Sequence, residues 1–189
     1  MNDRDELSSI FMVNHIVRFL EYEERILELV PELIVCNKWE YKNEYKANMD
    51  NVYMHTLYVV GYVYGDLTLS LVALFHDIGK LYTKKETNGK IHYLGYEETS
   101  ATIARMVLNR LDYDESIIND VCTIIKKQNE KINPTIKDIK LVVDSIGKIN
   151  FERLLGLQRG HIFVAGNEND EITIPKLDKI KEVYINGDF

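Results

Sequence analysis

Apolar residues recur at three- and four-residue spacing along most of this 189-residue chain, which is the pattern of amphipathic α-helices. The longest such stretch covers residues 5–30 and meets Pro31, a residue that kinks or ends a helix. With only 3 prolines and 10 glycines, the chain has little material for long linkers. We therefore predict an all-α fold, a compact bundle of seven to nine helices, in a single domain that spans residues 1–189.

Capping residues and turn formers set the expected helix boundaries. We expect helices over residues 51–64, 67–77, 96–111, 115–127, 134–146, 149–165 and 174–184. Asp66 is the expected cap of the second of these helices, and Asn133, followed by Pro134, is the expected cap of the fifth. Loops are expected at residues 36–50, at residues 79–94 with a short extended piece, and at residues 166–173.

The net charge of −7 argues against an extended nucleic-acid surface, because such surfaces need many lysines and arginines. A local basic patch would still suffice for a small anionic substrate. Cys36 and Cys122 stand alone in apolar helical stretches and are expected to be buried, reduced thiols. The N-terminus is polar, unlike a signal peptide, and no apolar run approaches the about 18 residues of a membrane span. We expect a cytoplasmic protein without membrane contact, and the sequence leaves its oligomeric state open.

The stretch "ALFHDIGKLYTKK", residues 73–85, places His76 and Asp77 at the end of an apolar helix. Adjacent helical positions point about 100° apart, so both side chains reach one ion only near a helix terminus, where these two lie. His55 lies on the preceding helix, and an antiparallel pair of helices joined at Gly65 brings it to the same end. A His-Asp pair taken by itself is more often a helix end, in which Asp77 bonds to the helix backbone and His76 is a core histidine. The alternative is a metal site.

Several stretches, in order, resemble the HD-domain metal-dependent phosphohydrolases. They are "LVPEL", "NEYKANMDNVYMHTL", "RLLGLQRGH" and the whole segment from "ALFHDIGK" to "ARMVLNRL". The likeness is closest to the HD region in the body of bacterial tRNA nucleotidyltransferases and poly(A)-polymerase-like enzymes, and it is strongest over residues 25–165. It implies the HD-domain fold. Nothing before residue 50 resembles the nucleotidyltransferase head, so we do not expect nucleotide addition to RNA.

In that family the metal ligands are a histidine, a His-Asp pair and a distant aspartate. The resemblance assigns the first three to His55, His76 and Asp77, and the distant position falls at His161. An imidazole in place of a carboxylate implies a divalent ion such as Mn, Fe, Co, Ni or Zn rather than Mg alone. The alternative is that His161 is a core or surface histidine and the fourth ligand is lost.

Two further positions depart from the family pattern. Tyr96 stands where the family often has a histidine after the loop, and Gln128 stands near the histidine that often ends the next helix. Such histidines help to bind a second ion. The resemblance therefore implies either a single metal ion or an altered pocket.

The chemistry implied is hydrolysis of a phosphate ester by a metal-activated water. Asp77, as a metal ligand that also orients the water, and Lys80, as a point charge on a phosphate, are the expected catalytic residues. The expected substrate contacts are Lys80, Lys84, His92, Tyr96, Tyr58 and Gln128. The alternative for the lysines is a solvated surface charge, and for the tyrosines a core aromatic at helical spacing.

Two functions from different classes follow. The first is a metal-dependent phosphohydrolase whose partner is a small phosphorylated substrate, a nucleotide or cyclic nucleotide, cut as a phosphomonoester or (cyclic) phosphodiester. The second is a catalytically degenerate HD domain that binds a nucleotide or RNA end without hydrolysis. A purely structural helical module is a third, weaker alternative.

Overall fold

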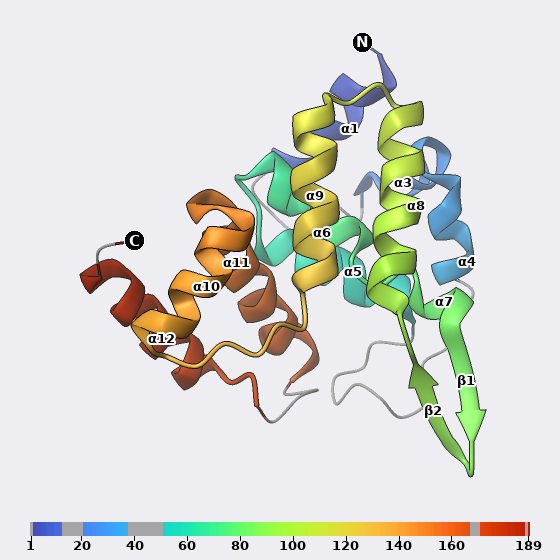
Figure 1. The fold of residues 1–189 in the computed structure, drawn as a ribbon. Coiled ribbons are helices and arrows are strands. Elements are labelled where there is room, and N and C mark those ends of the chain that lie inside the picture. The colour runs from blue at the N-terminus through green and yellow to red at the C-terminus, as the bar shows by residue number, and fades with distance from the viewer. Residues whose placement is uncertain (1, 13–20, 38–50, 167–170, 188) are drawn as a thin grey trace.

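The computed structural model describes residues 2–12, 21–37, 51–166, 171–187 and 189, and Figure 1 shows them as an assembly of helices with one small hairpin. The helices are α1 (Asp3–Phe11), α3 (Glu23–Leu29), α4 (Ile34–Asn37), α5 (Val52–Tyr62), α6 (Leu67–Phe75), α7 (Lys80–Thr83), α8 (Tyr96–Arg110), α9 (Glu115–Lys127), α10 (Ile136–Ile146), α11 (Lys148–Ala165) and α12 (Ile174–Asn186), with a 3₁₀ turn at Pro31–Leu33. The prediction of an all-α fold is confirmed.

Helix α6 lies at the centre of the core. Its last five residues, Leu71 to Phe75, are all fully buried. A helix that is apolar on every side needs neighbours on every side, and α6 packs against α5, α8, α9 and α11. Figure 1 shows α8 and α9 side by side in front of α5 and α6, with α10, α11 and α12 grouped at the other side of the molecule. The polar end of α6 is therefore surrounded by protein as well.

The expectation of one long helix over residues 5–30 is wrong. Helix α1 ends at Phe11 in a turn at Met12, and α3 begins after a turn at Tyr22; residues 13–20 lie outside the described part. Arg25 of α3 donates to both carboxylate oxygens of Glu6 in α1, at 2.8 and 2.7 Å. This bidentate pair holds the two helices side by side, an arrangement that a continuous helix would forbid.

The caps agree with expectation at one helix and differ at another. The Asp66 carboxylate accepts a hydrogen bond from the Leu69 N–H at 2.9 Å, as predicted for the start of α6. Helix α10 is capped by Thr135, whose hydroxyl accepts from the Asp138 N–H, and not by Asn133. The Asn133 amide donates instead to the Asp138 carboxylate at 2.7 Å. Of the loop expected at 36–50, residues 38–50 lie outside the described residues.

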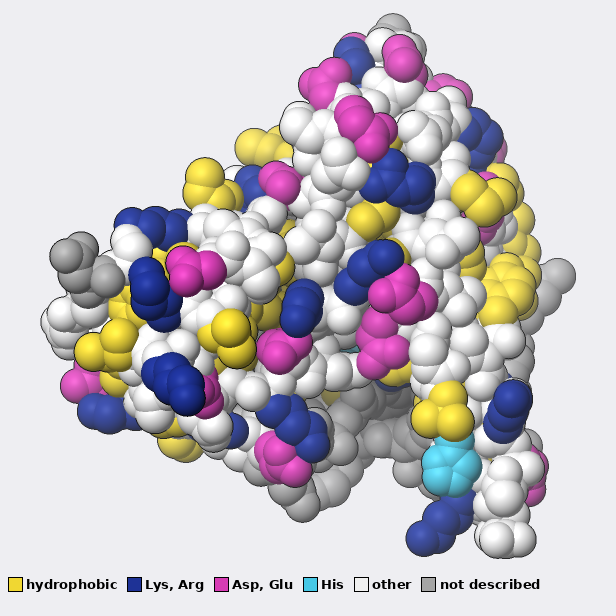
Figure 2. Space-filling model, in the orientation of Figure 1, with side chains coloured by type: hydrophobic (Ala, Val, Ile, Leu, Met, Phe, Trp, Pro, Cys, Tyr) yellow, Lys and Arg dark blue, Asp and Glu magenta, His cyan; other side chains and the backbone are white. Residues whose placement is uncertain are grey.

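A β-hairpin occupies the segment expected to be a loop with one extended piece. Strand β1 (Lys84–Thr87) pairs antiparallel with β2 (Lys90–Tyr93). The connecting Asn88 and Gly89 both have positive φ, 54° and 73°, as a two-residue type I′ turn requires. Strand β2 matches the expected extended piece, and β1 was missed. Figure 1 and the space-filling view in Figure 2 show the hairpin projecting from the helical body.

Candidate metal centre

Three helices bring together four side chains that could hold a metal ion. His55 comes from α5, His76 and Asp77 follow the last turn of α6, and His161 comes from α11. Helices α5 and α6 pack against each other, and α11 packs on both. Gly160 permits this close approach, because a Cβ there would lie 3.0 Å from the Tyr62 ring of α5. The sequence prediction that these four residues meet agrees with the geometry.

The spacing of the ligand atoms suits a single divalent ion. His55 Nε2 and His76 Nε2 are 3.3 Å apart, and Asp77 Oδ2 lies 3.7 and 3.4 Å from them. Each of the four residues offers an atom within 4.8 Å of the other three. Ligand atoms about 2.1 Å from an ion in tetrahedral arrangement are about 3.4 Å apart, so the observed separations fit that geometry.

Burial sets the protonation state of the cluster. His55, His76 and Asp77 are all 0% exposed. Burial lowers the pKa of both histidines, which favours the neutral imidazole that binds metal. Burial by itself raises the pKa of the Asp77 carboxyl, but the adjacent His76 and the Lys80 ammonium outweigh it and hold that pKa well below its usual range. At neutral pH the site therefore offers the Asp77 carboxylate and the neutral imidazoles of His55 and His76.

A hydrogen bond fixes the orientation of the His76 ring. His76 Nδ1 lies 2.7 Å from the carbonyl oxygen of Ala73, one turn earlier. A carbonyl only accepts, so Nδ1 carries the proton and Nε2 is left with its lone pair facing the cluster. The tautomer that a metal requires is thus selected by the helix that ends at this residue.

The turn after α6 is held by side chains from two other helices. The His76 carbonyl accepts from Ser100 Oγ of α8 and from the Gln128 amide at the end of α9, both at 2.9 Å. Ser100 Oγ also accepts from the Gly79 N–H at 2.9 Å. Gln158 of α11 donates in turn to the Gln128 carbonyl at 3.0 Å. We call Ser100 and Gln128 the carbonyl clamp, since together they fix the backbone from which two ligands project.

Neither Ser100 nor Gln158 was singled out by the sequence, whereas Gln128 was predicted to contact substrate. The only local signal was the glycine of "HDIGK". A Cβ on Gly79 would lie 2.2 Å from the Tyr96 carbonyl oxygen and 2.6 Å from the Ser100 nitrogen. The turn therefore passes directly against the backbone of α8, which brings Ser100 within hydrogen-bonding distance.

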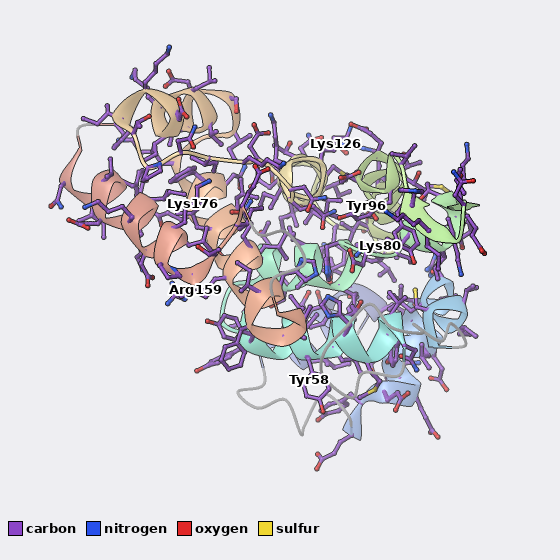
Figure 3. The ribbon with its side chains drawn as sticks, turned by 90° about the horizontal axis from the view of Figure 1, so that it is seen from below. Tyr58, Lys80, Tyr96, Lys126, Arg159 and Lys176 are labelled. Carbon is purple, nitrogen blue, oxygen red and sulfur yellow. The ribbon has the colours of Figure 1, made fainter. Side chains whose placement is uncertain are left out.

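Lys80 lies beside the ligand cluster. Its ammonium is 2.9 Å from Asp77 Oδ2, and its side chain is only 6% exposed. The ammonium also lies over the Tyr96 ring at 5.1 Å and the Tyr93 ring at 5.8 Å. Figure 3 shows Lys80 and Tyr96 close together, as these distances require. The aromatic rings and the carboxylate keep a positive charge at the edge of the site.

A cavity of about 630 Å³ adjoins the cluster at His161, and its volume lies within the range of about 300–1,000 Å³ that is usual for small-molecule sites. It is lined by Lys80, Ile91, His92, Tyr93, Tyr96, Gln128, Asn129, Lys131, Gln158, His161, Ile162, Gly166 and Ile172. Among the predicted substrate contacts, Lys80, His92, Tyr96 and Gln128 thus share one cavity.

Two predicted contacts lie elsewhere. Tyr58 is 38% exposed and does not line the cavity, and Figure 3 shows it well apart from Lys80 and Tyr96. Lys84 is exposed on β1 and is likewise absent from the cavity wall. A role for these two residues in holding a substrate in this cavity has no support from their positions.

Comparison with protein families identifies the fold around this cluster. The model of the HD domain matches residues 52–175, which include all four clustered side chains. The chain belongs to the HD-domain family. Members of this family are typically metal-dependent hydrolases, and the HD domain here extends from α5 to the start of α12. A search of curated proteins found no match.

In the described part of the chain, no helix has the length and apolar character to cross a membrane.

Proposed function

We propose that this HD domain is a metal-dependent phosphohydrolase that acts on a nucleotide-type phosphomonoester or (cyclic) phosphodiester. The observation that carries the proposal is the position of His161, which belongs to the ligand cluster and also lines the cavity. A substrate in the cavity therefore has direct access to the metal position. A divalent ion bound there supplies an activated water and a Lewis acid for the phosphate.

The residues of the chain itself supply positioning and charge. Lys80 Nζ, on the cavity wall next to Asp77, would hold a phosphoryl oxygen and neutralise the charge that builds up on it. Asp77 is ionised and fully buried, so its carboxylate can orient the attacking water by accepting its hydrogen bond. Tyr93 and Tyr96 fix the position of Lys80 from the cavity side.

Three imidazoles and one carboxylate favour Mn, Fe, Co, Ni or Zn over Mg, which prefers an all-oxygen shell. The order of the sequence stretches that resemble the HD region of tRNA nucleotidyltransferases supports a relationship with that region, which we propose. We also propose that residues 1–189 form a single HD domain. We also propose a cytoplasmic location and a small phosphorylated partner, a nucleotide or cyclic nucleotide.

The test combines metal analysis with an activity panel. The purified protein should contain close to one equivalent of a transition metal, and His161→Ala should reduce that content. Phosphomonoesterase and phosphodiesterase substrates are then assayed with Mn²⁺, Co²⁺, Ni²⁺ and Mg²⁺ added in turn. Absence of both bound metal and turnover under all four ions would refute the proposal. Unchanged metal content in His161→Ala would remove that residue from the ligand set.

A second function, binding without hydrolysis, is favoured by one specific observation. The two side chains at the positions of further family histidines already have partners within the protein: the Gln128 amide donates to the His76 carbonyl, and the Tyr96 hydroxyl accepts from Asn129 at 2.7 Å. Neither position therefore supplies the imidazole that the family pattern uses for a second ion. Tight binding of metal and nucleotide, measured by calorimetry without any turnover, would favour this function over hydrolysis.

A further inference from the structure

Two buried glutamines on the cavity wall turn their amide nitrogens toward the protein. Gln128 Nε2 donates to the His76 carbonyl oxygen at 2.9 Å. Gln158 Nε2 donates to the carbonyl oxygens of Gln128 and Glu130, each at 3.0 Å. A backbone carbonyl only accepts, so these bonds decide which end of each amide is nitrogen and which is oxygen. The orientation of both amides is therefore fixed by the backbone around them.

The two amide oxygens are open to the cavity. Gln128 and Gln158 are only 5% and 4% exposed, and both line the cavity. Neither oxygen accepts a hydrogen bond from a residue that the structure describes, and neither is closed off from solvent. For side chains so deeply buried, the open space beside these oxygens is the cavity itself. Both acceptors are therefore available to donors on a ligand.

This pair of acceptors selects the chemistry of the group that lies against it. A phosphate oxygen is itself an acceptor with negative charge, so it does not bind there. The two glutamines adjoin, since the side chain of Gln158 is bonded to the backbone of Gln128. A hydroxyl group has one hydrogen to donate, whereas the exocyclic amino group of a nucleobase has two N–H bonds in one plane. One amino group can thus satisfy both acceptors.

The rest of the cavity wall suits the other parts of a nucleotide. Ile91 of β2, Ile162 of α11 and Ile172 provide apolar surface for the faces of a planar base. Lys80 and His161 line the same cavity and mark the end at which the phosphate lies under the proposed function. The cation and the amide oxygens therefore give the two ends of a ligand opposite requirements.

We propose that the substrate is a nucleotide whose base carries an exocyclic amino group, which donates its two N–H bonds to Gln128 Oε1 and Gln158 Oε1. This inference rests on the proposed function, which supplies the phosphate end, and it makes the two glutamines specificity-determining residues. A base with a hydrogen or a carbonyl in that place leaves both acceptors unpaired, and a carbonyl also brings oxygen against oxygen. A site built to bind a donor discriminates against a ligand that lacks it.

The first test compares two ligands on the unmodified full chain. Adenosine 5′-phosphate and purine riboside 5′-phosphate differ only in that a hydrogen replaces the amino group. Calorimetry in EDTA, which prevents metal-dependent hydrolysis, should give a dissociation constant at least about tenfold larger for purine riboside 5′-phosphate, because two buried acceptors lose their donors. Equal constants would show that water serves the glutamines equally well and would overturn the inference, as would the absence of measurable binding of either compound.

A variant of Gln158 separates recognition from folding. Gln158→Met keeps the length of the side chain but has no amide, so the ratio of the two dissociation constants should fall to about threefold or less. A loss of packing alone would weaken both ligands by the same factor and leave the ratio as it is in the wild type. An unchanged ratio in this variant would overturn the inference, and if the variant does not fold, the comparison of ligands on the wild type decides.

The matched control is Asn150→Leu, which removes a buried amide from the same helix. Asn150 Nδ2 donates to Asp120 at 2.8 Å, and its Oδ1 accepts from Arg153 at 3.1 Å, so both ends of this amide have partners within the protein. Asn150 does not line the cavity. This variant should lose stability and keep the ratio of the two dissociation constants.

Turnover of the same two compounds with Mn²⁺ distinguishes this inference from the proposed function. We expect kcat/KM to be at least about tenfold higher for adenosine 5′-phosphate. Equal kcat/KM values would leave the proposed function standing and overturn the inference. Selective binding without turnover would count against hydrolysis, while the role of the two glutamines would stand.

Discussion

Removal of the Ser100 hydroxyl should weaken both the fold and metal binding. Ser100 is fully buried, and its Oγ accepts from Gly79 and donates to the His76 carbonyl. In Ser100→Ala the carbonyl keeps its bond from Gln128, but the buried Gly79 N–H loses its side-chain acceptor. A buried donor left without a partner costs about 1–3 kcal/mol, so the melting temperature should fall by about 4–8 °C for a loss near 2 kcal/mol.

The effect on the metal separates a positioning role from a merely structural one. Outer contacts that orient ligands typically change metal affinity about 10- to 100-fold, so Ser100→Ala should bind Co²⁺ or Zn²⁺ at least tenfold more weakly in chelator competition. The matched control is Ser145→Ala, which removes a hydroxyl bonded to the Val142 carbonyl at 2.8 Å on α10. Loss of stability with unchanged metal affinity in Ser100→Ala would refute the positioning role of the carbonyl clamp.

Three further predictions follow from burial and packing. Gly79→Ala should destabilise the protein by about 1–3 kcal/mol in a urea titration, because the added Cβ meets backbone atoms that cannot move away. The control Gly156→Ala should be tolerated in that titration, because its Cβ meets only the end of the Leu69 side chain at 3.1 Å. The folded-state pKa values of His55 and His76 lie below 6.5, so the unfolded protein takes up protons more readily at these two residues. Metal-free protein in EDTA should therefore keep its full stability above pH 6.5 and lose it as the pH falls further. A urea midpoint that stays constant from pH 8 to pH 5 would contradict this prediction. Burial raises the pKa of the Cys36 thiol to about 12. At pH 8 its reaction with a thiol reagent should therefore be much slower in the folded protein than in the urea-unfolded protein. Equal rates would show instead that the thiol is accessible in the folded protein.

The meeting of His55 with His76 and Asp77 could be predicted because these residues belong to two helices that are consecutive in the sequence. A glycine turn between two apolar helices makes them antiparallel, and this places His55 beside the His76–Asp77 end of α6. Helix α9 begins and ends where its periodicity and flanking residues indicated. The place of His161 was available only from family resemblance, since no local pattern tells which face of α11 meets α5.

What the sequence did not reveal depends on packing between distant segments. The role of Ser100 requires knowledge that α8 passes within hydrogen-bonding distance of the Gly79 turn, which no periodicity reports. Tyr58, which follows His55 by three residues on α5, was predicted to contact substrate, yet its side chain lies outside the cavity wall. The hairpin was a different kind of omission, because Asn88-Gly89 between two short polar strands is itself a strong hairpin signal.

The four ligands come from segments that are far apart in the chain. His55, His76 and Asp77 belong to the consecutive helices α5 and α6, while His161 comes from α11, after the hairpin and three intervening long helices. An ion bound by all four would act as a cross-link that fastens the late helix to the early pair. Folding and metal loading would then be thermodynamically linked: an ion at about 100 times its dissociation constant adds about 2.7 kcal/mol to stability. The abundance of the folded protein in a cell would accordingly depend on the supply of the metal, even when no substrate is present.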